Sequence, residues 1–488
     1  MARGSHVSSS LSGGLLIGGD RVTRSSGGAH QHIYPATGQP NASVQLAGAA
    51  EIDEAVASGW AAHREWMSLT ADRRRDKLID LADAVRDDLD ELARLNVHDY
   101  AVPISLAGNA ILLERFLRHF AGYVDKPHGL STPMAESFDV NLVEREPYGV
   151  VGVITPWNGA LVVIASCVAP ALAAGNAVVL KPSEVAPFAA LRFGELCVAA
   201  GLPAGLVNVV PAGPEGGDAL VRHPGIRKVH FTGGAATARK VLQAAAVNVT
   251  PVVAELGGKS AMIVFDDAEL DAAAMLSAHQ GPLIQSGQSC ACASRILAHE
   301  SVYDAFAERF VRAVTSAKAG DPFDPGVVFG PVISQPAADR IIAEIDEAVR
   351  NKAGELLTGG TRLGGELAKG YYIEPTVFGG VDNASTLAQT ETFGPVVSLM
   401  KFGSEADAVR IANDTPYGLN AFVQTRDLAR AHRVARRLEA GSVWINTFSD
   451  ISPQGPYGGF KQSGFGRTGG LDGLYEFLQV KNIRIGMG

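Results

Sequence analysis

From Gly149 onward, short apolar runs alternate with helical patterns. Helical spacing of apolar residues predicts helices near 160–174, 187–200, 214–223 and 235–246. Between them lie four runs that predict buried strands: VVGVIT, AVVLKP, GLVNVVP and KVHFTG. Strand and helix in regular alternation predict a parallel, doubly wound α/β sheet.

A second α/β unit is predicted beyond residue 260. It consists of SAMIVF, helices near 268–280 and 301–318, VSLMKF near 397 and SVWIN at 442–446. A chain of 488 residues is too long for one ordinary core, so two or three domains are expected. Residues 50–95 have a helical pattern in which Thr70 can cap a helix, and the polar stretch 131–146 predicts a projecting hairpin arm.

Charge and hydropathy exclude two classes of partner. The formal net charge is −9 and the acidic residues are spread along the chain, which argues against nucleic acid and against an anionic membrane surface. Residues 160–180 are apolar and uncharged, but Pro170 and the Gly175-Asn176 pair divide them into a helix and a strand. No transmembrane segment is therefore expected.

The N-terminus and the cysteine content indicate a cytoplasmic protein. MARGSHVSSSLSGG lacks the apolar core of a signal peptide. Four cysteines in 488 residues are too few for a disulfide scaffold, which agrees with a reducing compartment.

Two of those cysteines, Cys290 and Cys292, lie in GQSCACASR at 287–295. No second Cys or His pair stands at metal-ligand spacing, so no metal site is predicted. Two interpretations remain from these residues alone: inert buried thiols, or one reactive thiolate with a bystander.

Other short motifs lie at the predicted carboxyl ends of strands, where open α/β sheets bind ligands. They are PWNG at 156–159, KPSE at 181–184 and ELGGKS at 255–260. Together with ETFGPV at 391–396, PYGGFKQSGFGR at 456–467 and the cysteine motif, they resemble the aldehyde dehydrogenase superfamily, in order over roughly residues 30–485. The resemblance implies a Rossmann-like cofactor domain, a second α/β catalytic domain and a β oligomerisation arm.

The resemblance assigns the chemistry to three residues. Cys290, three residues after the glycine of the G-Q-x-C motif, is the expected nucleophile, and Cys292 is expected to be a packed thiol. The Asn158 amide and the Cys290 backbone N–H are the expected oxyanion donors, and Glu255 the base that releases a thioester. Taken singly, Asn158 could be a turn residue at a strand end and Glu255 a solvated or paired carboxylate.

The cofactor implied is NAD, with NADP possible. Glu184 near Lys181 can accept hydrogen bonds from ribose hydroxyls and would repel a 2′-phosphate, so NAD is expected to be preferred. The pyrophosphate is expected near FTGGAATARK, where Gly234 replaces a usual serine and Ala238 a usual glycine. Trp157 and Pro211 are expected to line the cleft. The full set of expected cofactor contacts is Thr155, Trp157, Lys181, Ser183, Glu184, Gly233, Gly234, Leu256, Glu391 and Phe393.

The resemblance also implies domain boundaries and an assembly. Residues 1–126 and 148–256 would form the cofactor-binding domain and 257–455 the catalytic domain. Residues 127–147 and 456–488 would form the arm and C-terminal segment of a homodimer or homotetramer. Two further departures from the family pattern have no functional account: GRTGG lacks a usual glutamate after Arg467, and HDYAVPIS replaces ETGK.

The resulting prediction is oxidation of an aldehyde to a carboxylic acid with NAD(P)+ through a thiohemiacetal and a thioester on cysteine. The alternatives are a CoA-acylating dehydrogenase, for which a hydrolytic base would be superfluous, and a catalytically idle relative. The residues expected near the aldehyde tunnel include several small side chains, which favours bulky apolar or aromatic aldehydes. These residues are Gly159, Val163, Ser166, Ser289, Ile451 and Tyr457.

Overall fold

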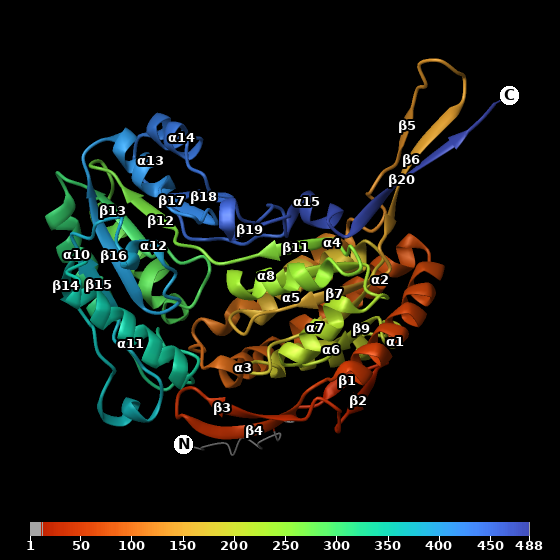
Figure 1. Ribbon diagram of the computed structural model, residues 1–488, viewed down its shortest axis with the longest axis horizontal. Helices are drawn as coiled ribbons and strands as arrows, with labels where there is room; N and C mark the ends of the chain where they lie inside the picture. The colour runs from red at the N-terminus through yellow and green to blue at the C-terminus, as the bar shows by residue number, and fades with distance from the viewer. Residues whose placement is uncertain (1–10, 12, 488) are drawn as a thin grey trace.

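The computed structural model describes residues 11 and 13–487, and its largest sheet has eight strands in the order β19-β11-β10-β7-β8-β9-β1-β2 (Figure 1). The five central strands run parallel, as predicted, and three antiparallel pairings extend the sheet at its two edges. The parallel strands are β7 (Val150–Ile154), β8 (Ala177–Lys181), β9 (Val207–Val209), β10 (Lys228–Thr232) and β11 (Val252–Glu255). The edge strands are β1 (Leu15–Ile17), β2 (Asp20–Val22) and β19 (Gly464–Phe465).

The four predicted crossover helices of this unit are confirmed. They are α5 (Ala160–Ala173), α6 (Phe188–Ala199), α7 (Pro214–Arg222) and α8 (Ala235–Ala245). The helical stretch predicted over 50–95 consists of separate helices, and Thr70 caps the second by accepting the backbone N–H of Arg73. These N-terminal helices are α1 (Ala49–Ser68), α2 (Ala71–Asp87), α3 (Leu89–Tyr100) and α4 (Ala110–Ala121).

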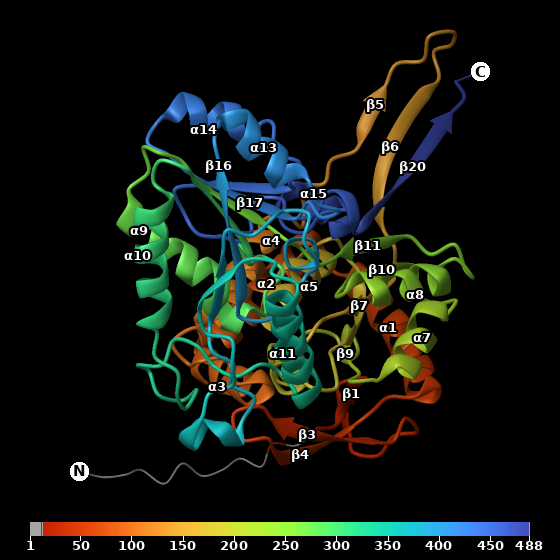
Figure 2. The same ribbon diagram turned by 60° about the vertical axis from the view of Figure 1, so that its left-hand side comes forward.

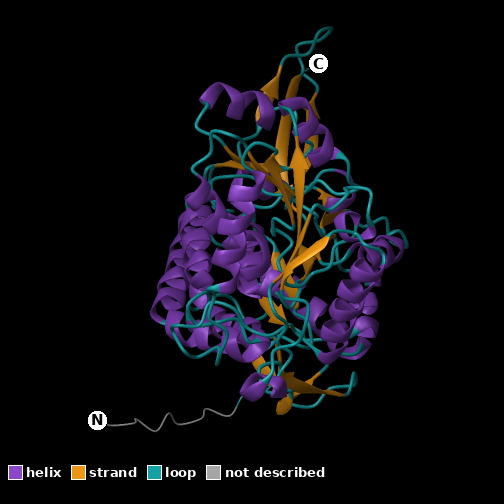
Figure 3. Cartoon of the chain, turned by 90° about the vertical axis from the view of Figure 1, so that its left-hand side faces the viewer, coloured by secondary structure: helices purple, strands orange, loops and turns teal. Residues whose placement is uncertain are grey.

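The second sheet has seven strands in the order β14-β15-β16-β13-β12-β17-β18. Its strands are β12 (Ala261–Val264), β13 (Arg295–His299), β14 (Glu355–Thr358), β15 (Thr376–Gly379), β16 (Val396–Phe402), β17 (Asn420–Gln424) and β18 (Ser442–Ile445). Its helices are α9 (Leu270–Ala278), α10 (Tyr303–Thr315), α11 (Gln335–Arg350), α12 (Thr386–Gln389), α13 (Glu405–Asn413) and α14 (Leu428–Ala435). Figure 3 shows strands through the middle of the molecule and helices on both flanks.

The predicted hairpin arm projects from the body of the molecule (Figures 1 and 2). It consists of β5 (Leu130–Thr132) and β6 (Val140–Pro147), and the C-terminal strand β20 (Leu478–Ile485) pairs antiparallel with β6. The short helix α15 (Gly470–Tyr475) precedes β20. A separate two-stranded sheet of β3 (Ala29–Tyr34) and β4 (Gln39–Gln45) was not predicted.

The apolar stretch over residues 160–180 lies in the core. Helix α5 is buried along almost its whole length and contacts α4, and β8 is fully buried in the sheet. None of the helices in the described part of the chain is long and apolar enough to cross a membrane. Most of the N-terminal stretch MARGSHVSSSLSGG, for which no signal peptide is expected, lies outside the described residues.

Candidate active site

The carboxyl ends of β7, β8, β10 and β11 meet at one edge of the large sheet. Ile154 pairs with Lys181 on one side and with Phe231 on the other, and Thr232 pairs with Glu255. The motifs that follow these strands therefore converge, as predicted from parallel topology. A cleft of ≈ 940 Å³ opens there, and residues of the second unit, including Cys290 and Phe393, complete its lining.

A left-handed turn presents Cys290 to this cleft. Gln285, Ser286 and Gly287 have φ values of 48°, 56° and 72°, and the two non-glycine residues are held in this unfavourable region by surrounding contacts. Ser286 Oγ donates to Gly330 O at 2.7 Å, and Gln288 Nε2 donates to Gln285 O at 3.0 Å. The turn fixes the backbone on which the cysteine sits.

Asn158 contacts the same loop from the first unit. Its Nδ2 donates to Gln288 O at 3.0 Å, which places the side chain beside the cysteine motif and in the cleft. A primary amide has two N–H donors, so one remains for a ligand. The neighbouring Gly159 has φ 69° and directly precedes α5, a backbone conformation that glycine adopts without strain.

Cys290 and Cys292 differ in access rather than in acidity. Burial raises the pKa of each thiol to about 12. Cys290 is partly exposed and lines the cleft, whereas Cys292 is buried and lines a separate small hollow. The Cys290 sulfur also lies 4.0 Å from the Tyr457 hydroxyl oxygen, whose hydrogen bond opposes the effect of burial on the thiol pKa.

Glu255 brings an unpartnered carboxyl group into the cleft. Both carboxylate oxygens are buried and lack a hydrogen-bond partner in the described structure. Burial raises the pKa of Glu255 well above its usual range, and Arg467 opposes this shift. A Cβ added to Gly458 would lie 2.7 Å from Glu255 Oε1, so glycine leaves the room that this carboxyl group occupies.

All ten residues expected to contact the cofactor line this one cleft. Phe393 packs edge-on against Trp157, with ring centroids 5.6 Å apart. Glu391 accepts the backbone N–H of Gly258 at 2.9 Å. Gly234 immediately precedes α8 at the cleft, while Ala238 is buried and Pro211 lies outside the lining.

The residues expected at the aldehyde tunnel are more scattered. Val163 lines the large cleft and Tyr457 contacts Cys290, but Ser289 lines the small hollow beside Cys292. Ser166 Oγ donates to Val163 O within α5, and Ile451 packs against the core of the first unit. The cleft lining therefore includes one of these six residues, Val163.

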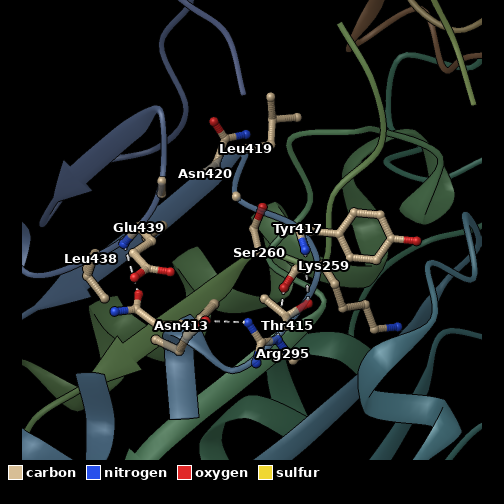
Figure 4. Close-up of a pocket in the computed structure, with 15 residues that line it drawn as sticks. Lys259, Ser260, Arg295, Asn413, Thr415, Tyr417, Leu419, Asn420, Leu438 and Glu439 are labelled. Carbon is tan, nitrogen blue, oxygen red and sulfur yellow. Dashed lines mark hydrogen bonds between the residues drawn. The ribbon is translucent and has the colours of Figure 1, made fainter. Parts of the chain in front are cut away.

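A second small hollow contains polar residues that the sequence did not single out (Figure 4). Arg295, buried at the start of β13, donates to Lys259 O at 2.8 Å, to Asn383 Oδ1 at 2.9 Å and to the last turn of α13. Asn420 lines the same hollow and donates through Nδ2 to the Tyr457 oxygen at 3.2 Å. A single Asn at the start of an apolar strand has no distinctive pattern, and only the tertiary contact identifies it.

Comparison with known proteins identifies the family of this chain. The profile of the aldehyde dehydrogenase family matches residues 22–483. A solved structure of PnpE in complex with nicotinamide adenine dinucleotide is 37% identical with a TM-score of 0.94, and the alignment covers 97% of each chain. Betaine aldehyde dehydrogenase from Staphylococcus aureus, solved with NAD+, is 34% identical with a TM-score of 0.94 over 97% of this chain and 95% of that one. The chain belongs to the aldehyde dehydrogenase family.

Proposed function

We propose that this protein oxidises an aldehyde to a carboxylic acid with NAD+, through a thioester on Cys290. One observation carries the proposal: Asn158, Glu255 and Cys290 line a single cleft together with all ten expected cofactor contacts. The combination of a thiol, a carboxyl base and an amide donor suits acyl chemistry at a carbonyl carbon.

In the first step the Cys290 thiol loses its proton to water, and the thiolate adds to the aldehyde carbon to form the thiohemiacetal oxyanion. The carbonyl oxygen becomes an oxyanion, and the free N–H of Asn158 and the backbone N–H of Cys290 stabilise it. Because Asn158 is already held by Gln288 O, the donor is oriented before the substrate arrives. The chain thus supplies both the nucleophile and the donors without rearrangement.

Glu255 acts after oxidation, when the acyl group is bound to Cys290 as a thioester. Bound NAD+ supplies the hydride acceptor for the oxidation itself. The ionised Glu255 carboxylate takes a proton from a water molecule, which attacks the thioester and releases the carboxylic acid. Burial raises the pKa of Glu255, which makes the carboxylate a stronger base than an exposed one.

Several residues of the cleft suit a dinucleotide. Thr155 Oγ1 is buried without a hydrogen-bond partner in the described structure, and Gly233 and Gly234 lead into the N-terminus of α8. A helix N-terminus of this kind favours a phosphate group. Lys181 and Glu184 line the same cleft, and the Glu184 carboxylate supports a preference for NAD over NADP.

The proposal predicts opposite outcomes for the two neighbouring cysteines. Cys290→Ala should abolish NADH formation from an aldehyde panel, because the nucleophile is removed. Cys292→Ala is the matched control and should keep most of the activity, since Cys292 is buried outside the cleft. Loss of activity in the control alone would refute the assignment of the nucleophile.

Two other activities are distinguished by the same assay. Acceleration by CoA with release of an acyl-CoA would identify a CoA-acylating dehydrogenase. No NADH formation with any aldehyde of the panel would identify a catalytically idle relative. We expect neither outcome, because Glu255 is placed in the cleft as a hydrolytic base requires.

We also propose domain boundaries and an assembly. Residues 1–126 and 148–256 form the cofactor domain, and residues 257–455 form the catalytic domain. Residues 127–147 and 456–488 form the arm and C-terminal segment of a homodimer or homotetramer. Four free cysteines and a thiol nucleophile suit a reducing compartment such as the cytoplasm. The apolar side chain of Val163 at the cleft supports bulky apolar or aromatic aldehydes as substrates.

A further inference from the structure

Tyr457 and Asn420 form a hydrogen-bonded pair beside Cys290. The Tyr457 oxygen lies 4.0 Å from the Cys290 sulfur, at the outer limit of a hydrogen bond to sulfur. Asn420 Nδ2 donates to the same oxygen at 3.2 Å. Asn420 is the first residue of β17 and lines the hollow shown in Figure 4, so the pair links that hollow to the nucleophile.

The pair determines where the hydroxyl proton of Tyr457 can point. A phenol has one O–H donor, and its oxygen here accepts the amide N–H of Asn420. The proton is therefore free to point at the sulfur. The Tyr457 backbone is also held, because it exchanges hydrogen bonds of 2.7 and 2.8 Å with Thr468.

Apart from the Tyr457 hydroxyl and the Cys290 backbone N–H, which both lower the pKa of the Cys290 thiol, the surroundings of this residue oppose a thiolate. After burial, the largest influence that raises the pKa of this thiol is Glu391, and Glu255 acts in the same direction. Cys292 also lies close enough to interact with Cys290, and the buried Lys259 interacts with Cys292 and Glu391. The Tyr457 hydroxyl is the side-chain hydrogen bond that lowers the thiol pKa.

We propose that Tyr457 is a further catalytic residue, which donates a hydrogen bond to the Cys290 thiolate, and that Asn420 is the positioning residue that directs this hydroxyl. The inference rests on the proposed role of Cys290 as the nucleophile. Tyr457 keeps its proton throughout, and the proton of the thiol passes to water. The amide orientation is essential, because a carbonyl oxygen turned toward Tyr457 would accept the phenol proton and withdraw it from the sulfur.

The test measures thiol alkylation in the full-length protein without cofactor. Iodoacetamide forms a thioether with the thiolate and releases iodide, and peptide mass spectrometry identifies the modified cysteine. Tyr457→Phe should move the pH profile of Cys290 alkylation upward by about one unit, which makes the reaction about tenfold slower below the pKa. Asn420→Ala should move the profile in the same direction by less, because the freed hydroxyl can still reach the sulfur.

Tyr372→Phe is the matched control. It removes another buried tyrosine hydroxyl, one that donates to Gly320 O, and should leave the profile unchanged. An unchanged profile in Tyr457→Phe, or faster alkylation in Asn420→Ala, would overturn the inference. Modification of Cys292 in place of Cys290 would instead contradict the proposed function. Tyr457→Phe retains the ring, so it tests the hydrogen bond even if Asn420→Ala fails to fold.

Discussion

Glu255 is buried in the cleft with neither carboxylate oxygen hydrogen-bonded within the described structure, and this determines its dependence on pH. Burial raises its pKa, so the protonated form, which cannot act as a base, persists to higher pH than for an exposed glutamate. Deacylation should therefore be slow at low pH and accelerate as pH rises through the raised pKa.

Glu255→Gln tests this role at the level of single steps. The variant should retain a first burst of NADH, because Cys290 and Asn158 are intact, but steady turnover should fall and lose its pH-dependent acceleration. Rapid mixing and intact-protein mass spectrometry measure the burst and the accumulated acyl-enzyme. Equal loss of burst and turnover would show that Glu255 acts before the thioester forms.

At the residue scale, the ten expected cofactor contacts line one cleft, although their roles toward a cofactor stay predictions. Eight of them lie at or just after the carboxyl ends of β7, β8, β10 and β11, whose register the parallel sheet fixes. Glu391 and Phe393 come from the loop before β16 of the second unit. Ser289 and Ser166 were harder to place, since neighbouring residues in a turn or helix point in different directions. Asn420 was missed because its contact with Tyr457 spans 37 residues of sequence.

At the scale of elements, the turn after α8 is strained at Val249. Val249 follows α8 with φ 54°, a conformation that β-branched residues rarely adopt, and its side chain is 86% exposed. The left-handed conformation costs about 1–2 kcal/mol for a residue with a Cβ. Little burial offsets this cost, because the side chain is mostly in solvent.

Val249→Gly should therefore stabilise the protein by about 1 kcal/mol, since glycine adopts the left-handed conformation without strain. The change is measured as a rise in the midpoint of thermal unfolding at constant protein concentration. Val247→Gly is the matched control: this valine, also exposed, is not among the residues with positive φ, so its replacement should not stabilise. A lower midpoint for Val249→Gly would mean that its side chain makes a contact worth more than the strain.

Helices and strands were predicted where apolar periodicity is strong. The segments expected at 160–174 and 235–246 correspond to α5 and α8 within one residue at each end. The N-terminal strands β1 to β4 were not predicted, because β1 and β2 have three residues each and β3 and β4 contain few buried residues. The three left-handed residues before Cys290 also have no clear sequence signal, since Gln and Ser are not typical of that conformation.

At the scale of the whole molecule, one face of the arm exposes apolar side chains, with Arg145 and Asn482 on the same face. Leu130 pairs with Val143, and Val480 pairs with Arg145 two residues further along β6. Residues two apart on a strand share a face, so Leu130, Val143 and Val480 lie on the same side of the arm. Leu130 is 64% and Val480 61% exposed.

Exposed apolar side chains on a projecting sheet favour contact with a second copy of this chain. Replacing Leu130 and Val480 together by Asp should lower the mass measured by light scattering after size exclusion, because two charges would have to be buried in the contact. Gln479→Asp is the control: it adds a charge to the opposite face of β20, pairing with Glu146, and should leave the mass unchanged. A double variant with the same mass as the unmodified protein would show that this face does not hold subunits together. Since neither residue lines the cleft, Cys290 alkylation should be retained in the double variant, which separates loss of assembly from loss of the active-site fold.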